Sequence, residues 1–360
     1  MWPERSVSFW YDCSGCSGPQ PDWPSLLRKV KAHKPAITSI ILFCGVEIAT
    51  GGLVAGLERW NSSACATQLV PSLLRLGVRV EMGVQSGTSD VRDYRQLFAT
   101  DPHDLAQQLA TLGRHHGLSG WNMDLEPQRG NPASTASDAL QYSNWAQKVR
   151  PSLHGAGLRF TTAVASWGPM IANYEVISRG FDRVMDMSTY NAVSLSAWLS
   201  VFEQFTASTP LAATSVGLGC WIDAQTNGTG PEHWSATAAS ATQRMCYAMN
   251  LSLPEVSFWV LGPDENTAQK TESFWWAPLL RYLAGGGCQP PPLPPAEVCP
   301  TTLPHSHREA PGGCCVASYI PGCAESCEEA LCNGTAGWYW ERGLNYSHDL
   351  YTCCPSKTVE

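Results

Sequence analysis

Short apolar runs rich in Val, Ile and Thr alternate along the chain with longer segments of helical periodicity. This alternation is typical of repeated β-α units, which build a parallel sheet. It predicts eight strands, at Val7–Tyr11, Ile37–Cys44, Val78–Val84, Gly120–Glu126, Arg159–Ala165, Arg183–Ser188, Ala213–Leu218 and Val256–Leu261. Amphipathic helices are expected at Asp104–His115, Ser137–His154, Ala236–Met249 and Ser273–Leu283. Ser137 or Asp138 is the expected N-cap of the second helix.

The number and spacing of these strands predict an α/β protein, a (β/α)8 TIM barrel over residues 1–286. Eight strands over about 280 residues agree with the roughly 250 residues typical of that fold. An open, doubly wound sheet is the alternative. It is disfavoured because no glycine-rich phosphate loop follows the first strand.

The fourth predicted strand, Gly120–Glu126, carries the most informative pattern of the chain. Alternation places Asn122, Asp124 and Glu126 on one face and only apolar residues on the other. Carboxylates in a strand buried on both sides cost free energy, so their presence indicates that function requires them. Pro127 ends the strand, so Glu126 is expected at the C-terminal mouth of the barrel, where such enzymes have their catalytic residues. A purely structural network of the two acids is the alternative.

The composition changes after the predicted barrel. Residues 287–298 are rich in proline and are expected to form a stiff linker. Residues 299–360 contain eight cysteines, Cys299, Cys314, Cys315, Cys323, Cys327, Cys332, Cys353 and Cys354. Because so short a segment buries little core, we expect a small module held together by disulfides. The sequence does not determine which cysteines pair. A zinc module using His305, His307 and His348 is the alternative, but the segment lacks paired Cys-x-x-Cys motifs.

Charge and aromatic content narrow the class of partner. The 360 residues carry a net charge of −8, and only 15% of them are charged. This balance disfavours a nucleic-acid partner and suits neutral substrates. The 15 Trp and 11 Tyr residues belong mostly to the core, but flat aromatic rings are also the platforms on which sugars stack. The composition therefore favours a carbohydrate partner.

Cysteine usage indicates an oxidising compartment, and five Asn-x-Ser/Thr sequons, at Asn61, Asn227, Asn250, Asn333 and Asn345, agree with it. We expect an extracellular or secretory-pathway protein and a monomer. No apolar leader follows Met1 here, so export is expected through a leader outside this sequence or by another route. The longest apolar stretch, near Ala36–Val46, is too short and too polar to span a membrane. For Cys13 and Cys16, a local disulfide or a pair of thiols is favoured over a redox site.

Residues Ser119 to Glu126 resemble the fourth-strand motif Asp-Gly-x-Asp-x-Asp-x-Glu of glycoside hydrolase family 18, the chitinases and endo-β-N-acetylglucosaminidases. Gly120, Asp124 and Glu126 match this motif, whereas Ser119 and Asn122 stand where the family has aspartates. The third-strand Ser-x-Gly-Gly signature is absent. The resemblance covers roughly residues 6–284.

Two weaker similarities lie near the sixth and eighth strands. Tyr190 and Asn191 stand where the family has the Tyr-Asp of its Met-x-Tyr-Asp motif, and Trp259 fits the tryptophan at the floor of the family's sugar site. Trp167 and Trp221 follow the fifth and seventh strands, so both are expected at the barrel mouth as candidate sugar-stacking residues, with ordinary packing as the alternative.

The resemblance implies a retaining hydrolase that cleaves β-linked N-acetylglucosamine with the substrate's own 2-acetamido group as nucleophile. Glu126 is then the general acid, Asp124 holds the acetamido N–H, and Tyr190 donates to the acetamido carbonyl. Asn122 is expected to orient Asp124 through a hydrogen bond, and the like charge of Asp124 to favour the protonated form of Glu126. No metal or organic cofactor is implied.

Two other interpretations remain open. A chitinase-like lectin keeps the cleft without turnover, but family lectins commonly lose the glutamate that this chain retains as Glu126. Family 85 of the endo-β-N-acetylglucosaminidases has Gly-Trp followed by Asn-x-Glu, which Gly120 and Trp121 resemble, but Asp124 stands where that family has Asn. The choice between families changes the substrate from chitin to the N-glycan core.

Overall fold

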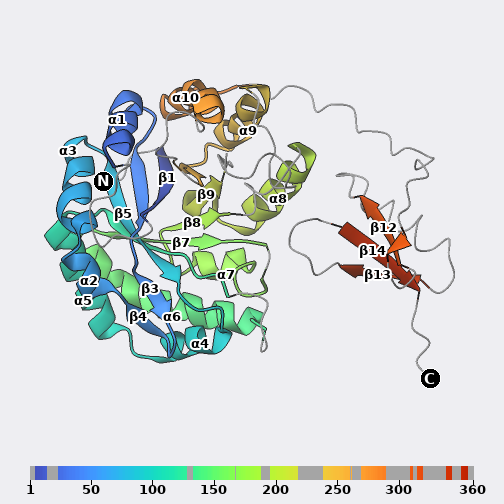
Figure 1. The fold of residues 1–360 in the computed structure, drawn as a ribbon, viewed down its shortest axis with the longest axis horizontal. Helices are drawn as coiled ribbons and strands as arrows, with labels where there is room; N and C mark the ends of the chain where they lie inside the picture. Colours follow the sequence, from blue (N-terminus) through green and yellow to red (C-terminus); the bar gives the residue numbers. More distant parts are fainter. Residues whose placement is uncertain are drawn as a thin grey trace.

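The N-terminal part of the protein is a closed barrel of parallel strands surrounded by helices (Figure 1). The computed structural model describes residues 5–13, 23–127, 133–166, 168–187, 195–217, 238–259, 261 and 269–288, and in the C-terminal part 309–310, 314–318, 338–342 and 350–355. The barrel strands are β1 (Ser6–Asp12), β2 (Ser39–Phe43), β5 (Arg79–Ser86), β6 (Gly120–Met123), β7 (Arg159–Val164), β8 (Arg183–Asp186), β9 (Thr214–Gly217) and β10 (Glu255–Phe258). Each pairs with the next in parallel, and β10 pairs with β1, so the barrel has no free edge. The predicted (β/α)8 barrel is confirmed.

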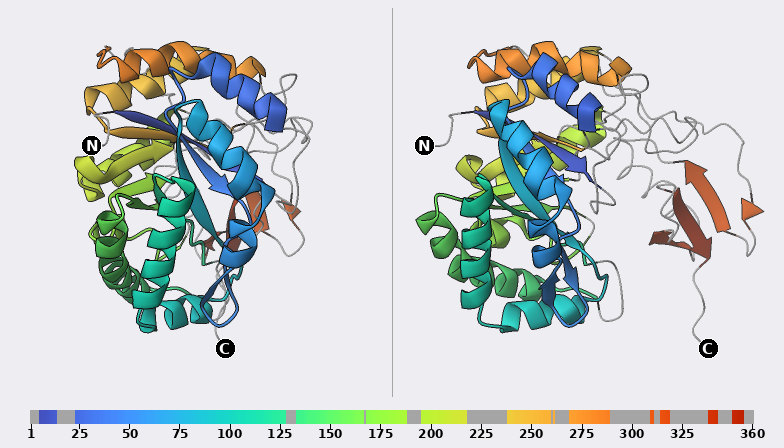
Figure 2. Two further views of the ribbon diagram at one scale, coloured as in Figure 1. Left: turned by 90° about the vertical axis from the view of Figure 1, so that its left-hand side faces the viewer. Right: turned by 60° about the vertical axis from the view of Figure 1, so that its left-hand side comes forward.

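Helices cover the outside of this barrel. They are α1 (Trp23–His33), α2 (Leu57–Asn61), the π-helix η1 (Cys65–Leu69), α3 (Val70–Arg75), α4 (Val91–Ala99), α5 (His103–His116), α6 (Ala136–Gly155), α7 (Tyr174–Ser178), α8 (Leu195–Ser208), the 3-10 turn η3 (Leu211–Ala213), α9 (Ala238–Asn250) and α10 (Gln269–Leu283). The last two helices pack against each other on one side of the barrel (Figure 2). Among the described helices, none has the length and apolarity needed to cross a bilayer.

The structure corrects several predicted boundaries. β6 ends at Met123 rather than Glu126, because its ladder with β5 stops at the Val84–Met123 pair. The N-cap of α6 is Thr135, not Ser137 or Asp138. Thr135 and Asp138 form a capping box, in which the Asp138 carboxylate accepts from the Thr135 amide at 2.7 Å.

A hairpin of β3 (Glu47–Ala49) and β4 (Leu53–Ala55) was not predicted, because two three-residue strands give too little alternation to detect. Its first strand continues the sheet beside the C-terminal end of β5, where Ile48 pairs with Ser86. The hairpin therefore lies beside the mouth of the barrel. It pairs with one edge of β5, and the other edge of β5 pairs with β6, the strand that Asp124 and Glu126 follow.

Charged residues close the N-terminal end of the barrel interior. Arg159 on β7 donates to Glu81 on β5 and, at 2.7 Å, to Glu255 on β10. These strands are not neighbours of β7 in the barrel, so the side chain crosses the interior. Arg183 on β8 adds a second cation at 3.3 Å from Glu255. This floor, formed by Glu81, Arg159, Arg183 and Glu255, depends on charges that neutralise one another in a dry environment.

Gly120, the first residue of β6, makes room for Arg159. A Cβ atom on Gly120 would lie 2.5 Å from the Arg159 carbonyl oxygen and 2.8 Å from its Cγ. No side chain fits there unless β7 moves away. The glycine therefore serves close packing of two strands.

The C-terminal part contains a separate antiparallel sheet in the order β11 (Glu309–Ala310), β12 (Cys314–Ser318), β14 (Leu350–Pro355) and β13 (Trp338–Arg342). Cys315 and Cys353 are directly paired in the ladder of β12 and β14. Residues 289–298 of the predicted linker lie outside the described residues, as do Cys299, Cys323, Cys327 and Cys332.

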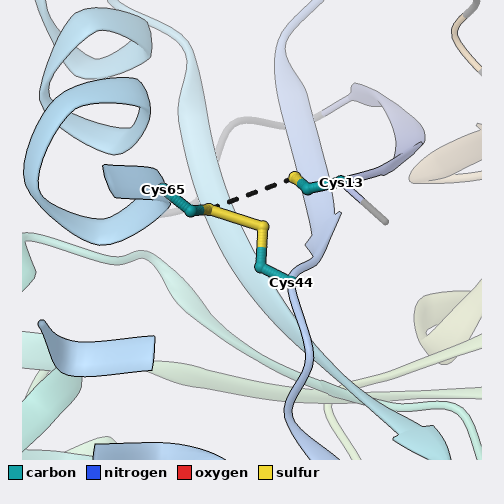
Figure 3. Close-up of side chains that lie close together, drawn as sticks. All are labelled: Cys13, Cys44 and Cys65. Atoms are coloured by element: carbon teal, nitrogen blue, oxygen red, sulfur yellow. Dashed lines mark hydrogen bonds between the residues drawn. A yellow bond between two sulfur atoms is a disulfide. The ribbon is translucent and has the colours of Figure 1, made fainter. Parts of the chain in front are cut away.

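Within the described part of the barrel, two disulfides link its segments. Cys44, after β2, is bonded to Cys65 at the start of η1, and Cys246 on α9 is bonded to Cys288 beyond α10. The Cys13 sulfur at the end of β1 lies 4.0 Å from that of Cys65, so three sulfurs meet beside the barrel mouth (Figure 3). Cys16, the other member of the predicted local pair, lies outside the described residues.

We expect Arg159→Met to lower the free energy of unfolding by about 3–5 kcal/mol, because it leaves buried carboxylates without their cation. Arg179→Met is the matched control. Arg179 forms an exposed ion pair with Glu175, 2.7 Å long, and its loss should cost no more than about 0.5 kcal/mol. Urea denaturation measures both variants, and equal losses would contradict the structural role given to Arg159.

The Cys44–Cys65 disulfide closes a loop with a sequence separation of 21 residues. Its removal in Cys44→Ala/Cys65→Ala should lower stability by about 3 kcal/mol, since the unfolded chain gains conformational freedom. Each single variant should lose nearly as much as the double variant, because each breaks the same bond. Thermal or urea unfolding of all three provides the measurement. Additive single losses would show that the two cysteines act independently.

Candidate active site

A pocket opens at the C-terminal ends of the barrel strands, where (β/α)8 enzymes have their active sites. Its lining residues come from five different strand ends: Trp10 on β1, Phe43 on β2, Asp124 and Glu126 after β6, Met187 after β8 and Trp259 after β10. In the circular order of the strands, β6 lies opposite β10. The two carboxyl groups therefore face an aromatic wall across the mouth.

The aromatic wall consists of Trp10, Phe43 and Trp259. The Trp259 ring centroid lies 5.7 Å from that of Phe43 and 6.3 Å from that of Trp10, and both ring pairs are tilted. Trp10 and Phe43 are buried, whereas Trp259 is partly exposed. Phe43 occupies space that any side chain on Gly83 of β5 would fill. A half-exposed tryptophan supported by buried rings is suited to stacking on a sugar ring.

Asp124 is a buried carboxyl with an unused acceptor. Its side chain is 8% exposed, and within the described structure its Oδ1 atom has no hydrogen-bond partner. Burial, and next the nearby charge of Glu126, raise the pKa of Asp124 well above its ordinary value. A carboxyl in this setting holds its proton to a higher pH than an exposed one, and its Oδ1 is available to a donor from outside the protein.

Glu126 is half-buried in the same pocket, two residues further along. Its amide donates to the Ser86 hydroxyl at 2.6 Å, and that hydroxyl donates to the Asp124 carbonyl at 3.1 Å. The Asp124 amide still bonds to the Val84 carbonyl at 2.9 Å. The backbone that carries both acids is therefore fixed to β5 although the regular ladder has ended.

Asn122 does not orient Asp124 as predicted. It lies fully buried below Asp124 and donates to the Thr161 hydroxyl at 2.8 Å and to the Met185 sulfur at 3.6 Å. Thr161 donates its own proton to Glu81 at 2.9 Å, so it accepts from Asn122, which fixes the amide with its nitrogen toward Thr161. The Asn122 carbonyl oxygen has no partner within the described structure.

The structure thus brings four of the eight predicted site residues together: Asp124, Glu126 and Trp259 line the pocket, and Asn122 lies beneath them. Tyr190, Asn191, Trp167 and Trp221 lie outside the described residues. Trp10, Phe43 and Met187 also line the pocket and were not predicted from the sequence. A signal existed for the first two, since each is an aromatic residue at the C-terminal end of a barrel strand.

Within the described chain, the cysteines Cys13, Cys44 and Cys65 form the one group of potential ligands whose spacing suits a metal ion. Two of their sulfurs are joined in a disulfide, so we assign this group as a disulfide site rather than a metal site. In the pocket itself, the described lining offers oxygen ligands from Asp124 and Glu126 alone.

The barrel is similar in fold to solved chitinases. A chitinase from Chromobacterium violaceum shares 16% identity and a TM-score of 0.57, with 78% of this chain and 99% of that chain covered. The spore cortex-lytic enzyme SleL of Bacillus cereus shares 11% identity and a TM-score of 0.58 over 80% of this chain and 75% of its own. A Group II chitinase domain of Ostrinia furnacalis bound to the oligomer (NAG)5 shares 14% identity and a TM-score of 0.56, with 80% and 98% covered.

No protein-family model and no curated protein matches the sequence. At identities this low the structural likeness shows the fold alone, which is the barrel predicted from the number and spacing of the strands. The chemistry of the pocket has to be argued from its own residues.

Asp124→Asn should stabilise the protein at neutral pH. Because folded Asp124 has a raised pKa, it keeps its proton where the unfolded chain has lost it, so wild-type stability falls as the pH rises above the ordinary value of 3.8. Asparagine does not titrate, so the variant should gain on the wild type toward pH 7 and lose this advantage below about pH 4. Urea denaturation across this range is the measurement. Asp104→Asn, at an exposed carboxyl, is the control, and a less stable Asp124→Asn at pH 7 would refute the argument.

Proposed function

We propose that the protein is a glycoside hydrolase that cleaves β-linked N-acetylglucosamine in chitin, chitooligosaccharides or an N-glycan core. The observation that supports this best is the unpartnered Oδ1 of Asp124, a buried acceptor beside a half-buried carboxyl and opposite an aromatic wall. A buried acceptor without a donor is costly, and an acetamido N–H is a donor of the right kind. The chitinase-type fold agrees with this assignment.

The proposed mechanism uses the two carboxyl groups differently. Glu126, the more exposed one, donates a proton to the glycosidic oxygen as the bond to the leaving sugar breaks. Burial and the charge of Glu126 raise the pKa of Asp124, which disfavours its anionic form and makes it a poor nucleophile. The substrate's acetamido oxygen therefore attacks the anomeric carbon, and Asp124 Oδ1 accepts from the acetamido N–H. Water later opens the cyclic intermediate, with Glu126 taking the proton back.

The surrounding residues bind the sugar. Trp259 provides a partly exposed face for the ring, supported by Trp10 and Phe43. We further propose that Tyr190 donates to the acetamido carbonyl and that Asn191, Trp167 and Trp221 contact the sugar at the mouth. No metal or organic cofactor takes part in this mechanism.

The organisation of the chain is part of the proposal. Residues 1–286 form the catalytic domain, 287–298 the linker and 299–360 a cysteine-rich module. The protein is a monomer that acts outside the cell or in the secretory pathway. The cysteine content and the disulfides of the barrel support this location, since such bonds persist in oxidising compartments.

Glu126→Gln should lower kcat by at least about 10²-fold while sugar binding persists, because the amide keeps the shape but cannot donate the proton. The substrates are chitooligosaccharides and a high-mannose glycopeptide, with products measured by mass spectrometry. Glu175→Gln, at an exposed glutamate, is the control. Oligosaccharides with hydroxyl in place of the acetamido group should remain intact.

Near wild-type turnover by Glu126→Gln would exclude the assigned general acid. If the wild-type protein binds chitooligosaccharides and cleaves none of these substrates, the protein is a lectin and not a hydrolase. Cleavage of the hydroxyl analogue at a comparable rate would refute the acetamido group as nucleophile.

A further inference from the structure

The hydroxyl of Ser86 occupies an unusual place between the two acids. The regular ladder of β5 and β6 ends at the Val84–Met123 pair. Two residues further, a single atom, Ser86 Oγ, accepts from the Glu126 amide at 2.6 Å and donates to the Asp124 carbonyl at 3.1 Å. The backbone is thereby held on both sides of Leu125, the residue between the acids.

In a regular parallel ladder, the main-chain N–H and C=O of Ser86 would make these two bonds. A hydroxyl can replace both groups, because it carries one donor and two acceptor lone pairs. The main chain of β5 pairs on its other side with the hairpin, where Ile48 is the partner of Ser86 and the Gln85 amide donates to the Val46 carbonyl at 2.9 Å. β6 therefore leaves the ladder at Asp124 while its backbone stays attached to β5 through one side chain.

A buried tyrosine lies near Ser86 and the two acids. Tyr94 on α4 is fully buried and donates its hydroxyl proton to the Thr88 carbonyl, just beyond β5. Burial raises the pKa of Tyr94 to about 12, and the charges of Asp124 and Glu126 add to that shift. Tyr94, Ser86 and the two acids therefore lie within electrostatic range of one another. Ser86 itself is absent from the pocket lining.

We propose that Ser86 is a positioning residue for the pair formed by Asp124 and Glu126. Its hydroxyl fixes the two peptide groups from which these side chains start, and it does so without touching the substrate. The expected effect of Ser86 on catalysis rests on the function proposed above. The hydroxyl bridge itself does not depend on that function. Small displacements of catalytic groups are costly, with about 10²-fold in rate for a misplacement near 1 Å.

The test compares Ser86→Ala, which removes the bridge, with Ser86→Thr, which keeps the hydroxyl. Ser257→Ala is the matched control, because it removes a buried hydroxyl from β10 that has no hydrogen-bond partner within the described structure. On chitooligosaccharides, Ser86→Ala should lower kcat by about 10- to 100-fold with KM changed by less than about twofold. Ser86→Thr should recover most of that loss, and Ser257→Ala should behave as the wild type.

A second readout works without any activity. The side-chain carboxyl carbon of Asp124, followed by NMR as the pH is changed, should titrate at a lower pH in Ser86→Ala than in the wild type, because the released backbone admits water. If the wild type cleaves no substrate but this shift occurs, the hydrolase assignment fails and the positioning role stands. An unchanged Asp124 titration in Ser86→Ala overturns the positioning role, as does a kcat loss that Ser86→Thr shares in full.

Discussion

The barrel depends on one buried cation, the Arg159 guanidinium, which joins strands that do not touch each other. It reaches Glu81 on β5 and Glu255 on β10 from β7, and both carboxyl groups are fully buried. Burial alone would raise the pKa of Glu255, but Arg159 and Arg183 outweigh burial and hold it well below its usual range. Burial keeps the pKa of Glu81 raised in spite of Arg159. The charged side chains at the floor therefore stabilise one another, and removing one of them leaves a buried charge uncompensated.

Polar groups are paired at the floor of the barrel and partly unpaired below its mouth. A column of hydrogen bonds joins the two ends. From Arg159 it passes through Glu81 and Thr161 to Asn122, directly below Asp124. Every group on the floor end of this column is paired, whereas Asn122 Oδ1 and Asp124 Oδ1 at its upper end lack partners within the described structure. The paired end stabilises the fold. The unpaired end destabilises it and leaves acceptors for a ligand, which is the usual balance between stability and function.

Local sequence patterns predicted the barrel and the position of Asp124 and Glu126, because alternation and Pro127 are properties of a single strand. Contacts between distant segments escaped prediction. The partner of Asn122 is Thr161, 39 residues away, and the residue that holds the backbone beyond the β6 ladder is Ser86, 40 residues before Glu126. Arg159 and Glu255 are 96 residues apart, and nothing in either strand alone indicates that they meet. Sequence gives the direction of a side chain in a strand, but its partner depends on the register between strands.

The departures from the family motif follow from this arrangement of charges. Asn122 stands where the family has an aspartate, and its neighbour Thr161 already donates to the buried Glu81. A second carboxylate at position 122 would share that hydroxyl with Glu81 and add like charge in a dry interior, which is unfavourable. A neutral amide can donate to Thr161 instead. Ser119 likewise bonds to the Val80 carbonyl at 2.8 Å without adding charge. The interior thus holds a buried acid at Glu81 on β5 and a neutral amide at Asn122 on β6, and the two acids beyond β6 face the pocket.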